Sequence, residues 1–446
     1  MTRLFGTDGI RGIANVDLKP TLAYALGRAT AHLLASGRGP IVLGQDTRRS
    51  GDMLAAAIVA GATSMGVDVH RAGVLPTPAL AHLAGIGEFA AGIVVSASHN
   101  PADDNGLKVL DQRGIKLDDA VEDELDRLIW RADELASPTN AGIGRDIDAH
   151  SLVERYVEHR SALARRNPND LRVVVDCANG SGCDVAARII AASGARVETI
   201  HAEPDGVNIN LGCGATHPES LAAAVAERGA DLGIALDGDA DRCVAVDEKG
   251  RVVDGDRLIG LIALDRLGRE ALAECTVVVS ILSNGGLAAA VERAGGHIVR
   301  TPVGDKYILD AMLVSGAGLG GEKSGHVIIS EHASAGDGIV TALETLGILG
   351  RRGVPLSALA AQVTLYPQQQ RSVRVRHKDQ WDADAALVSA VAAAELELAG
   401  RGRILVRPSG TEPVLRIMVE GEEAESVTVI ADRLAALAAE RLNQPA

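Results

Sequence analysis

Three aspartates at alternating positions carry the strongest chemical signal in this chain of 446 residues. They are Asp237, Asp239 and Asp241 of the segment LDGDADR, which directly follows an apolar run. Because side chains of extended backbone alternate between two faces, carboxylates at every second position project to one side. Such a cluster repels itself unless a cation joins it, and Mg²⁺ accepts carboxylate oxygens readily. The segment therefore predicts a magnesium site whose ligand shell phosphate or hydroxyl oxygens would complete.

Other interpretations of the same aspartates stay open at this point. The spacing also matches the start of an EF-hand loop, with Glu248 at its twelfth position. However, Arg242 occupies the sixth position, where that loop needs glycine, and the flanking runs are typical of strands. A phosphatase with an aspartate nucleophile in a D-x-D loop is a second alternative, and a solvated acidic turn is a third.

A serine-rich segment offers a group that could carry phosphate. In IVVSASHNPADDNGLK an apolar run leads into Ser96, Ser98 and His99, and Lys108 ends the segment. Beside a metal loop a serine hydroxyl can act as phosphoryl carrier, because covalent catalysis divides a difficult transfer into two easier ones. Lys108 would then serve as proton shuttle or phosphate ligand. A plain strand-to-turn transition and a surface lysine are the structural alternatives.

The segment RPSGTEP, which lies between two predicted strands, predicts an anion site. It offers the Arg407 guanidinium, the Ser409 and Thr411 hydroxyls, and free N–H groups around Gly410. Guanidinium and backbone N–H groups are the donors that bind phosphate. An ordinary hairpin turn is the alternative for this segment taken alone.

Two further segments supply groups for a polar ligand. GEKSGH contains Glu322 and Ser324, which are able to bind sugar hydroxyls, and FGTDGIRG places Arg11 near the start of the chain. Basic, acidic and hydroxyl-bearing segments that lie hundreds of residues apart make most sense together as a phosphosugar site.

Composition narrows the class of protein. With 44 Lys and Arg against 59 Asp and Glu, the formal net charge is -15, which repels a nucleic-acid backbone and argues against general nucleic-acid binding. The five cysteines are scattered and form no C-x-x-C pair, which favours a reducing cytoplasmic setting over a disulfide framework or a zinc ribbon. No apolar run approaches the roughly 18 residues of a membrane span, and no signal segment begins the chain. We therefore expect a cytoplasmic protein with no membrane partner.

The elements that must position these segments repeat three times. Short β-branched runs alternate with helical patterns, as in βαβ units with a parallel sheet. The predicted strands are 41–44, 67–71 and 92–95 before SASHNP, then 171–176, 196–200 and 231–236 before DGDADR, then 276–282 and 297–301 before GEKSGH. Ligands of open α/β sheets bind beyond the carboxyl ends of strands, so the three segments are predicted to face one cleft.

From about Arg371 the pattern changes to a strand, an alanine-rich helix, a hairpin and a closing helix. We predict an α/β fold of three consecutive α/β domains with similar topology around a central cleft, followed by a smaller α+β C-terminal domain. The predicted domains are 1–149 with the phosphoserine loop, 150–254 with the magnesium loop, 255–367 with the sugar loop, and 368–446 with the phosphate loop.

FGTDGIRG, SASHNP, DGDADR, GEKSGH and RPSGTEP, in this order, resemble the α-D-phosphohexomutase superfamily across essentially the whole chain. The resemblance implies four domains around a central cleft and Ser98 as the phosphoserine. It also implies one Mg²⁺ per chain, bound by the Ser98 phosphate and by Asp237, Asp239 and Asp241. FGTDGIRG, NINLGCGATH and VGDKY are similar to the amino-sugar branch rather than to the phosphomannomutase or phosphoglucomutase branches.

The reaction that this branch implies is the interconversion of glucosamine 6-phosphate and glucosamine 1-phosphate through a phosphoserine enzyme and a bisphosphorylated sugar. In bacteria, the product would feed UDP-N-acetylglucosamine and cell-wall synthesis. Glucosamine or glucose 1,6-bisphosphate would act as primer. Another hexose within the superfamily, a magnesium-dependent sugar phosphatase and a non-catalytic phosphosugar-binding protein are the alternatives, and a homodimer stays open.

The expected roles of the site residues follow from this reaction. The catalytic group is Ser98, Lys108, Arg242 and His99; the substrate-binding group is Arg11, Glu322, Ser324 and His326; and the phosphate-binding group is Arg407, Ser409, Gly410 and Thr411. The chain departs from the usual family residues at Ala215, Ala240, Lys306 and Lys323. None of these departures removes a metal ligand or the serine.

Overall fold

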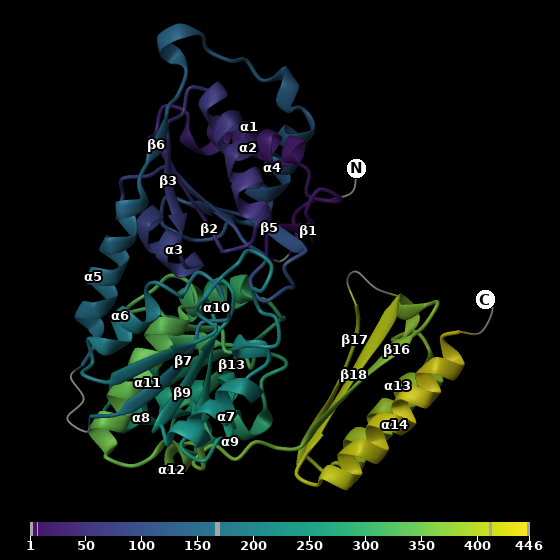
Figure 1. Ribbon diagram of the computed structural model, residues 1–446. Coiled ribbons are helices and arrows are strands. Elements are labelled where there is room, and N and C mark those ends of the chain that lie inside the picture. Colours follow the sequence, from purple (N-terminus) through teal and green to yellow (C-terminus); the bar gives the residue numbers. More distant parts are fainter. Residues whose placement is uncertain (1–2, 7, 166–169, 410–412, 444–446) are drawn as a thin grey trace. The chain divides into compact units, whose positions relative to one another are not determined.

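The computed structural model describes residues 3–6, 8–165, 170–409 and 413–443. The chain forms two compact units (Figure 1). The first contains residues 1–283 and 291–362, and the second contains residues 284–290 and 363–446.

The first sheet of the first unit carries the segment SASHNP. Its strand order is β1-β5-β4-β2-β3-β6, in which β2 pairs parallel with β3 and β4, while β5 pairs antiparallel with β4 and β1. The strands are β1 Ile10–Ile13, β2 Ile41–Gln45, β3 Val69–Val74, β4 Ala91–Val95, β5 Asp104–Asp111 and β6 Asp146–Asp148, and the helices are α1 Pro20–Thr30, α2 Ser50–Ser64, α3 Thr77–Gly85 and α4 Asp119–Trp130.

Glycine allows the first two of these helices to pack closely. A Cβ atom on Gly27 of α1 would lie 2.3 Å from the Ile58 carbonyl oxygen, and one on Gly61 of α2 would lie 2.1 Å from that of Tyr24. Only a residue without a side chain fits at either position. The first sheet is thereby covered by a tightly packed helix pair.

The second sheet carries the segment DGDADR and has the order β11-β10-β9-β7-β8. Strand β7 pairs parallel with β8 and β9, and β10 pairs antiparallel with β9. The strands are β7 Arg172–Asp176, β8 Arg196–Ile200, β9 Leu232–Leu236, β10 Cys243–Asp247 and β11 Val252–Val253, and the helices are α5 Val153–Leu163, α6 Ala186–Ala191 and α7 Glu219–Arg228.

The third sheet carries the segment GEKSGH and has the order β13-β12-β14-β15. Strand β12 pairs parallel with β13 and β14, and β15 pairs antiparallel with β14. The strands are β12 Thr276–Ser280, β13 His297–Thr301, β14 Leu319–Gly321 and β15 Val327–Ile329, and the helices are α8 Gly255–Gly268, α9 Gly285–Arg293, α10 Asp305–Ser315, α11 Gly338–Arg352 and α12 Leu356–Ala360.

The three sheets share one topology. In each, one strand lies between two parallel neighbours, and an antiparallel strand follows one of them. The turn after the central strand is also alike, because Asp46, Asp176 and Ser280 each accept a hydrogen bond from the backbone N–H two residues further on. The predicted threefold α/β repeat is therefore confirmed. The boundaries at residues 149, 254 and 367 stay predictions.

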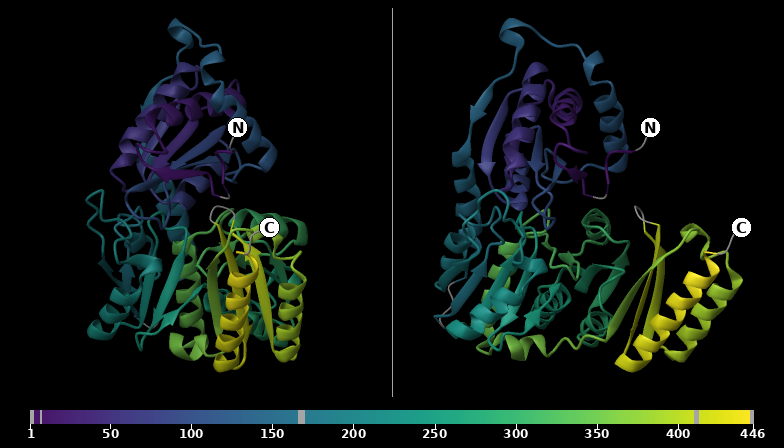
Figure 2. Two further views of the ribbon diagram at one scale, coloured as in Figure 1. Left: turned by 90° about the vertical axis from the view of Figure 1, so that its right-hand side faces the viewer. Right: turned by 45° about the vertical axis from the view of Figure 1, so that its right-hand side comes forward.

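The second unit is the predicted α+β fold. Its antiparallel sheet has the order β16-β18-β17, and its two long helices lie along that sheet (Figure 2). Leu387, Ile417, Val427 and Leu434 belong to its separate core. The strands are β16 Gln368–Arg374, β17 Gly402–Pro408 and β18 Val414–Gly421, and the helices are α13 Ala385–Glu397 and α14 Ala424–Arg441.

All five cysteines are free thiols. Among the described residues, no helix is both long enough and apolar enough to cross a membrane.

Candidate active site

Ser98 lies just beyond the buried strand β4, on a loop that several bonds hold in place. The residue has a positive φ of 51° and is 1% exposed. Its carbonyl oxygen accepts hydrogen bonds from Arg48 Nη2 at 3.0 Å and from Asn210 Nδ2 at 2.9 Å. Its backbone N–H donates to Ser96 Oγ, which in turn donates to Asp46 Oδ2 at 2.6 Å. Ser96 therefore supports the loop, and the Ser98 hydroxyl faces the neighbouring sheet.

The aspartate triad meets that hydroxyl. Asp237, Asp239 and Asp241 follow β9, and they are buried with carboxylate oxygens within 4.8 Å of one another. Ser98 Oγ donates a hydrogen bond to Asp237 Oδ2 at 2.6 Å. A Cβ atom at Gly238 would lie 2.6 Å from the Ser98 carbonyl oxygen, so this glycine allows the two loops to approach. The structure thus brings the predicted serine and the predicted metal ligands together.

The electrostatics of the triad fit a hard cation. Burial, and then the negative charges of Asp241 and Asp239, raise the pKa of Asp237 well above its ordinary value. Asp239 Oδ1 and Asp241 Oδ1 are buried without a hydrogen-bond partner among the described residues. Because buried polar atoms are almost always paired, these two oxygens indicate a missing ligand. Three carboxylates are the donor set that Mg²⁺ accepts. The triad could therefore hold a metal ion.

The EF-hand interpretation is wrong. The triad is flanked by the strands β9 and β10 rather than by two helices. Strand β9 is buried along its length, and Ala240 between the last two aspartates has a positive φ of 56°.

Lys108 lies in β5 and is buried against the triad. Its Nζ is 2.9 Å from Asp239 Oδ2 and 3.2 Å from Asp8 Oδ2. Burial lowers the pKa of this lysine, but the carboxylates of Asp239, Asp8 and Asp241 outweigh burial and raise it above its ordinary value. Lys108 is therefore a fixed positive charge at neutral pH. This state suits a phosphate ligand better than a proton acceptor.

His99 is the neutral group closest to the serine. Its Nδ1 is 3.4 Å from Ser98 Oγ. Burial, together with the charges of Arg242 and Arg11, lowers the pKa of His99 to about 4. A neutral imidazole can accept a proton, whereas Lys108 already carries one.

Two arginines border the serine loop and the triad. Arg11 Nη1 donates to the Ala97 carbonyl oxygen at 3.1 Å and to Asn100 Oδ1 at 3.2 Å, so it braces the serine loop. Arg242 Nε lies 3.9 Å from Asp237 Oδ2 and is buried without a hydrogen-bond partner among the described residues. Arg11 Nε is also buried without such a partner, so both arginines have a donor left for an anionic ligand.

The segment GEKSGH joins the triad loop through backbone contacts. Arg242 and His326 form a β-bridge, and Cys243 N donates to the Gly325 carbonyl oxygen at 2.9 Å. His326 Nδ1 is 3.5 Å from Asp241 Oδ2. Burial alone lowers the pKa of His326, but the Asp241 carboxylate outweighs it, and the pKa rises to about 9. His326 is thus placed beside the predicted metal ligands.

The other two predicted sugar ligands lie on the same loop, between β14 and β15. Glu322 Oε1 accepts a hydrogen bond from Gly304 N at 3.2 Å. Ser324 Oγ is buried and has no hydrogen-bond partner among the described residues. A buried hydroxyl without a partner is suited to a ligand hydroxyl.

The predicted phosphate loop belongs to the second unit. Arg407 is the second-last residue of β17, and burial followed by the charge of Arg416 lowers its pKa. Ser409 is buried, and its N–H donates to the Val414 carbonyl oxygen at 2.8 Å. Gly410 and Thr411 lie outside the described residues.

Three charged residues at the site were not identified from the sequence. Asp8 contacts Lys108, Asp305 contacts His326, and Lys116 pairs with both of these aspartates. Asp8 lies inside FGTDGIRG and Asp305 inside VGDKY, so their motifs could have drawn attention to them. Lys116 stands in no distinctive motif, and only its contacts reveal it.

Comparison with known proteins gives four consecutive family matches. The phosphoglucomutase/phosphomannomutase alpha/beta/alpha domain I matches residues 2–136, domain II matches 154–250, domain III matches 254–366, and the C-terminal domain matches 372–437.

Full-length relatives give a consistent picture. A phosphoglucosamine mutase from Moorella thermoacetica is 51% identical over 431 residues, which cover 96% of this chain and 97% of that protein. Seven further curated relatives, 46–48% identical, carry the same name.

Solved structures agree on the fold. A phosphoglucomutase/phosphomannomutase family protein from Burkholderia thailandensis has a TM-score of 0.85 at 27% identity, over 99% of this chain and 98% of that one. Aspergillus fumigatus N-acetylphosphoglucosamine mutase, solved in complex with GlcNAc-6P and magnesium, has a TM-score of 0.71 at 20% identity, over 99% of this chain and 96% of that one.

Proposed function

This chain belongs to the phosphoglucomutase/phosphomannomutase family, and we propose that it interconverts glucosamine 6-phosphate and glucosamine 1-phosphate, with Ser98 as phosphoryl carrier. The reaction makes it an isomerase. The observation that supports this proposal most directly is the buried hydrogen bond of 2.6 Å from Ser98 Oγ to Asp237. Asp237 belongs to the triad whose Asp239 and Asp241 each have an oxygen without a hydrogen-bond partner among the described residues. The choice of an amino sugar is supported by the relatives at 46–51% identity, all of which are named phosphoglucosamine mutase.

Asp237, Asp239 and Asp241, together with the phosphate on Ser98, would hold one Mg²⁺. When bound there, the ion supplies positive charge that stabilises the phosphoryl group during transfer. The triad fits this ion because its oxygens are hard donors and two of them have no other partner among the described residues.

The first half-reaction moves the phosphoryl group from Ser98 to the sugar. The bond between phosphorus and Ser98 Oγ breaks while a bond forms between phosphorus and the free hydroxyl oxygen of the sugar phosphate. One proton must pass from that hydroxyl to Ser98 Oγ for the charges to balance. His99 is neutral and 3.4 Å from Ser98 Oγ, so it is suited to relay this proton. Lys108 and Arg242 provide fixed positive charge beside the transferring group.

The second half-reaction reverses the chemistry after the bisphosphorylated sugar has turned round. The phosphoryl group at the other position returns to Ser98, and the proton moves back to the sugar oxygen. Glu322, Ser324 and His326 would hold the sugar, and Arg11 would orient the serine loop beside it. Arg407, Ser409, Gly410 and Thr411 would anchor the phosphate that does not react, and glucosamine or glucose 1,6-bisphosphate would prime Ser98.

A ³¹P NMR assay tests the reaction and its substrate together. Glucosamine, glucose and mannose 6-phosphates are each incubated with Mg²⁺ and a catalytic amount of sugar bisphosphate. We expect a 1-phosphate signal from each productive sugar and the highest kcat/KM with glucosamine 6-phosphate. Accumulation of inorganic phosphate instead would identify a phosphatase. A higher kcat/KM for glucose or mannose 6-phosphate would reassign the sugar and leave the family unchanged.

A further inference from the structure

A closed series of opposite charges begins and ends at the aspartate triad. Its members alternate in the sign of their charge, and charged atoms of successive members lie within 3.6 Å of each other. From Asp239 the series, here the charge ring, runs through Lys108, Asp8, Lys116, Asp305 and His326 to Asp241. It joins all three sheets of the first unit, because Lys116 follows β5, the triad follows β9, and Asp305 begins α10.

Lys116 is the one member of the charge ring that pairs with two carboxylates outside the triad. Its Nζ is 2.6 Å from Asp305 Oδ2 and is also bonded to Asp8 Oδ1. The side chain is 18% exposed, so the two ion pairs are well shielded from water. Burial lowers the pKa of Lys116, but the charges of Asp305 and Asp8 outweigh it and raise the pKa above its ordinary value.

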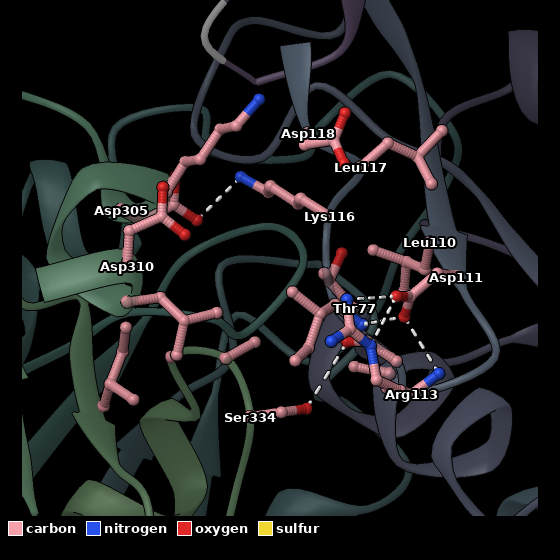
Figure 3. A pocket seen from close by; sticks show the side chains of 18 of the residues that line it. Thr77, Leu110, Asp111, Arg113, Lys116, Leu117, Asp118, Asp305, Asp310 and Ser334 are labelled. Carbon is pink, nitrogen blue, oxygen red and sulfur yellow. Dashed lines mark hydrogen bonds and ion pairs between the residues drawn. The ribbon is translucent and has the colours of Figure 1, made fainter. Parts of the chain in front are cut away.

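The side chain of Lys116 lies at the edge of a cavity in the first unit. It borders a cavity of about 320 Å³ whose wall also includes Asp241, Asp305 and His326. Figure 3 shows Lys116 extended toward Asp305 from the segment that also carries Leu117 and Asp118. Its Nζ forms ion pairs with Asp8 and Asp305.

The contacts of Asp8 and Asp305 explain how Lys116 could act at a distance. Asp8 also contacts Lys108, whose Nζ is 2.9 Å from the triad. Asp305 Oδ2 also lies 3.6 Å from His326 Nε2, and His326 contacts the triad from the other side. Without Lys116, Asp305 would draw His326 away from Asp241. Asp8 would keep its ion pair with Arg11 but would attract Lys108 more strongly, because one of the cations that offset its charge is lost.

We propose that Lys116 is a positioning residue for phosphoryl transfer, which acts by neutralising Asp8 and Asp305 so that Lys108 and His326 stay on the triad. It contacts neither Ser98 nor the triad itself, so its effect is on the orientation of those two side chains. This proposal rests on the proposed function, because its readout is the mutase reaction.

The test compares Lys116→Met with Lys116→Arg. Methionine keeps most of the length of the side chain and removes its charge, whereas arginine keeps the charge. We expect Lys116→Met to lower kcat at least ten-fold, counted per phosphorylated Ser98, with KM changed less than three-fold. Lys116→Arg should retain kcat within about five-fold. Counting active sites by phosphoserine separates misfolded protein from mispositioned side chains.

Lys306 provides a matched control. It borders the same cavity but pairs with Asp119 at 2.9 Å and with Glu122 at 3.7 Å, outside the charge ring. Lys306→Met should leave kcat within about two-fold. Equal losses in Lys116→Met and Lys306→Met would overturn the proposal, as would an equal loss in Lys116→Met and Lys116→Arg.

A double variant tests the mechanism independently of folding. If an unpaired Asp305 causes the loss, Lys116→Met combined with Asp305→Asn should recover kcat at least three-fold relative to Lys116→Met alone. A kcat no higher than that of Lys116→Met would overturn the role of Asp305. Ser98→Ala in the same assay distinguishes a failure of this proposal from a failure of the proposed function. Retained activity of Ser98→Ala would contradict the serine mechanism. Full activity of Lys116→Met would contradict only the role of Lys116.

Discussion

The Asp337 cluster and the aspartate triad are both buried in the first unit, but they differ in how their hydrogen bonds are completed. Asp337 is 1% exposed and accepts bonds from Arg160 Nε at 2.9 Å and from the Tyr156 hydroxyl at 3.1 Å. It also caps α11 by accepting from Ile339 N and Val340 N. Every oxygen of this carboxylate therefore has a partner within the protein.

The triad is buried to the same degree but remains incomplete. Asp239 Oδ1, Asp241 Oδ1 and Arg242 Nε have no hydrogen-bond partner among the described residues. Leaving a buried ionic group unpaired costs several kcal/mol, so a group that only stabilises the fold gains from complete pairing, as Asp337 does. Charge that is left unpaired beside a reactive hydroxyl is therefore the better indicator of a ligand site.

The largest effect that would test this difference is at Ser98. Ser98→Ala should reduce turnover below about a thousandth of the wild-type value, because the covalent route is lost. The melting temperature should change little, since the loss of one loop hydroxyl leaves no core cavity. Peptide mapping of the wild-type protein should locate phosphate on Ser98 that exchanges with labelled sugar bisphosphate.

Ser96→Ala is the internal control for that experiment. Ser96 bonds Asp46 and the Ser98 N–H, so its loss should cost about 1–3 kcal/mol of unfolding free energy, with a milder loss of turnover. Near-normal turnover of Ser98→Ala, or a phosphate trapped on Asp237, would revive the phosphatase with an aspartate nucleophile.

A pair of substitutions contrasts the two buried clusters directly. Arg160→Met should lower the free energy of unfolding by about 3–5 kcal/mol, because it leaves the buried Asp337 charge unpaired. Turnover per phosphoserine should stay within about two-fold of wild type.

Asp237→Asn should affect turnover rather than stability. It removes like-charge repulsion and so keeps or raises the free energy of unfolding measured without metal, but it abolishes turnover. Denaturant unfolding and the mutase assay measure the two effects, and parallel losses in both variants would remove the contrast.

Acid should weaken another cluster of the first unit, which lies around Glu344. Glu344 lies 3.2 Å from Arg266 and 3.3 Å from His332. Burial raises the pKa of Glu344, but the hydrogen bond from His332 and the charge of Arg266 outweigh it and lower the pKa from 4.5 to about 2. The stabilisation is therefore complete above pH 4.5 and is lost as the pH falls toward 2. The whole difference is worth about 3 kcal/mol.

Unfolding measured from pH 6 to pH 2 in wild type and Glu344→Gln tests this expectation. The stability advantage of the wild type should shrink across that range. A constant difference between the two proteins would show that the Glu344 carboxylate does not titrate as its contacts imply.

The smallest expected effect is at the phosphate loop of the second unit. Arg407→Ala should mainly raise KM, because the loss of a charge-assisted contact is worth roughly 1.5–3 kcal/mol, or about ten-fold to a hundred-fold in affinity. Unchanged KM and kcat would remove this arginine from the site.

Much of the fold could be predicted from local pattern. Buried strands such as β4 and β9 are continuous apolar runs, and each precedes a polar segment, so both their type and their carboxyl ends were predictable. The predicted strand at 276–282 ends at Ser280 in the structure, because the Ser280 hydroxyl accepts from Leu282 N and turns the chain. Ser283 N also donates to the Ser280 carbonyl oxygen at 3.0 Å, and periodicity does not reveal such turn bonds.

The sequence by itself determined which residues could do chemistry. Residue type and spacing predicted the chemistry of the alternating aspartates, of the serine after an apolar strand and of the GEKSGH loop. The resemblance already pointed to Ser98, and the structure adds the physical difference between the two serines: the Ser98 hydroxyl donates to Asp237, whereas the Ser96 hydroxyl donates to Asp46.

Only the tertiary structure decided how the charges pair. The sequence separates three of these charges widely, since more than 100 residues lie between any two of Asp8, Lys116 and Asp305. Taken alone, each is an ordinary charged residue. Ion pairs form between whichever charges the packing of the three sheets brings within about 4 Å, and in a buried site their strength depends on that distance and on exclusion of water. Neither quantity is encoded in the local order of residues, so the sequence identifies the reacting groups and the fold determines which charges hold them in place.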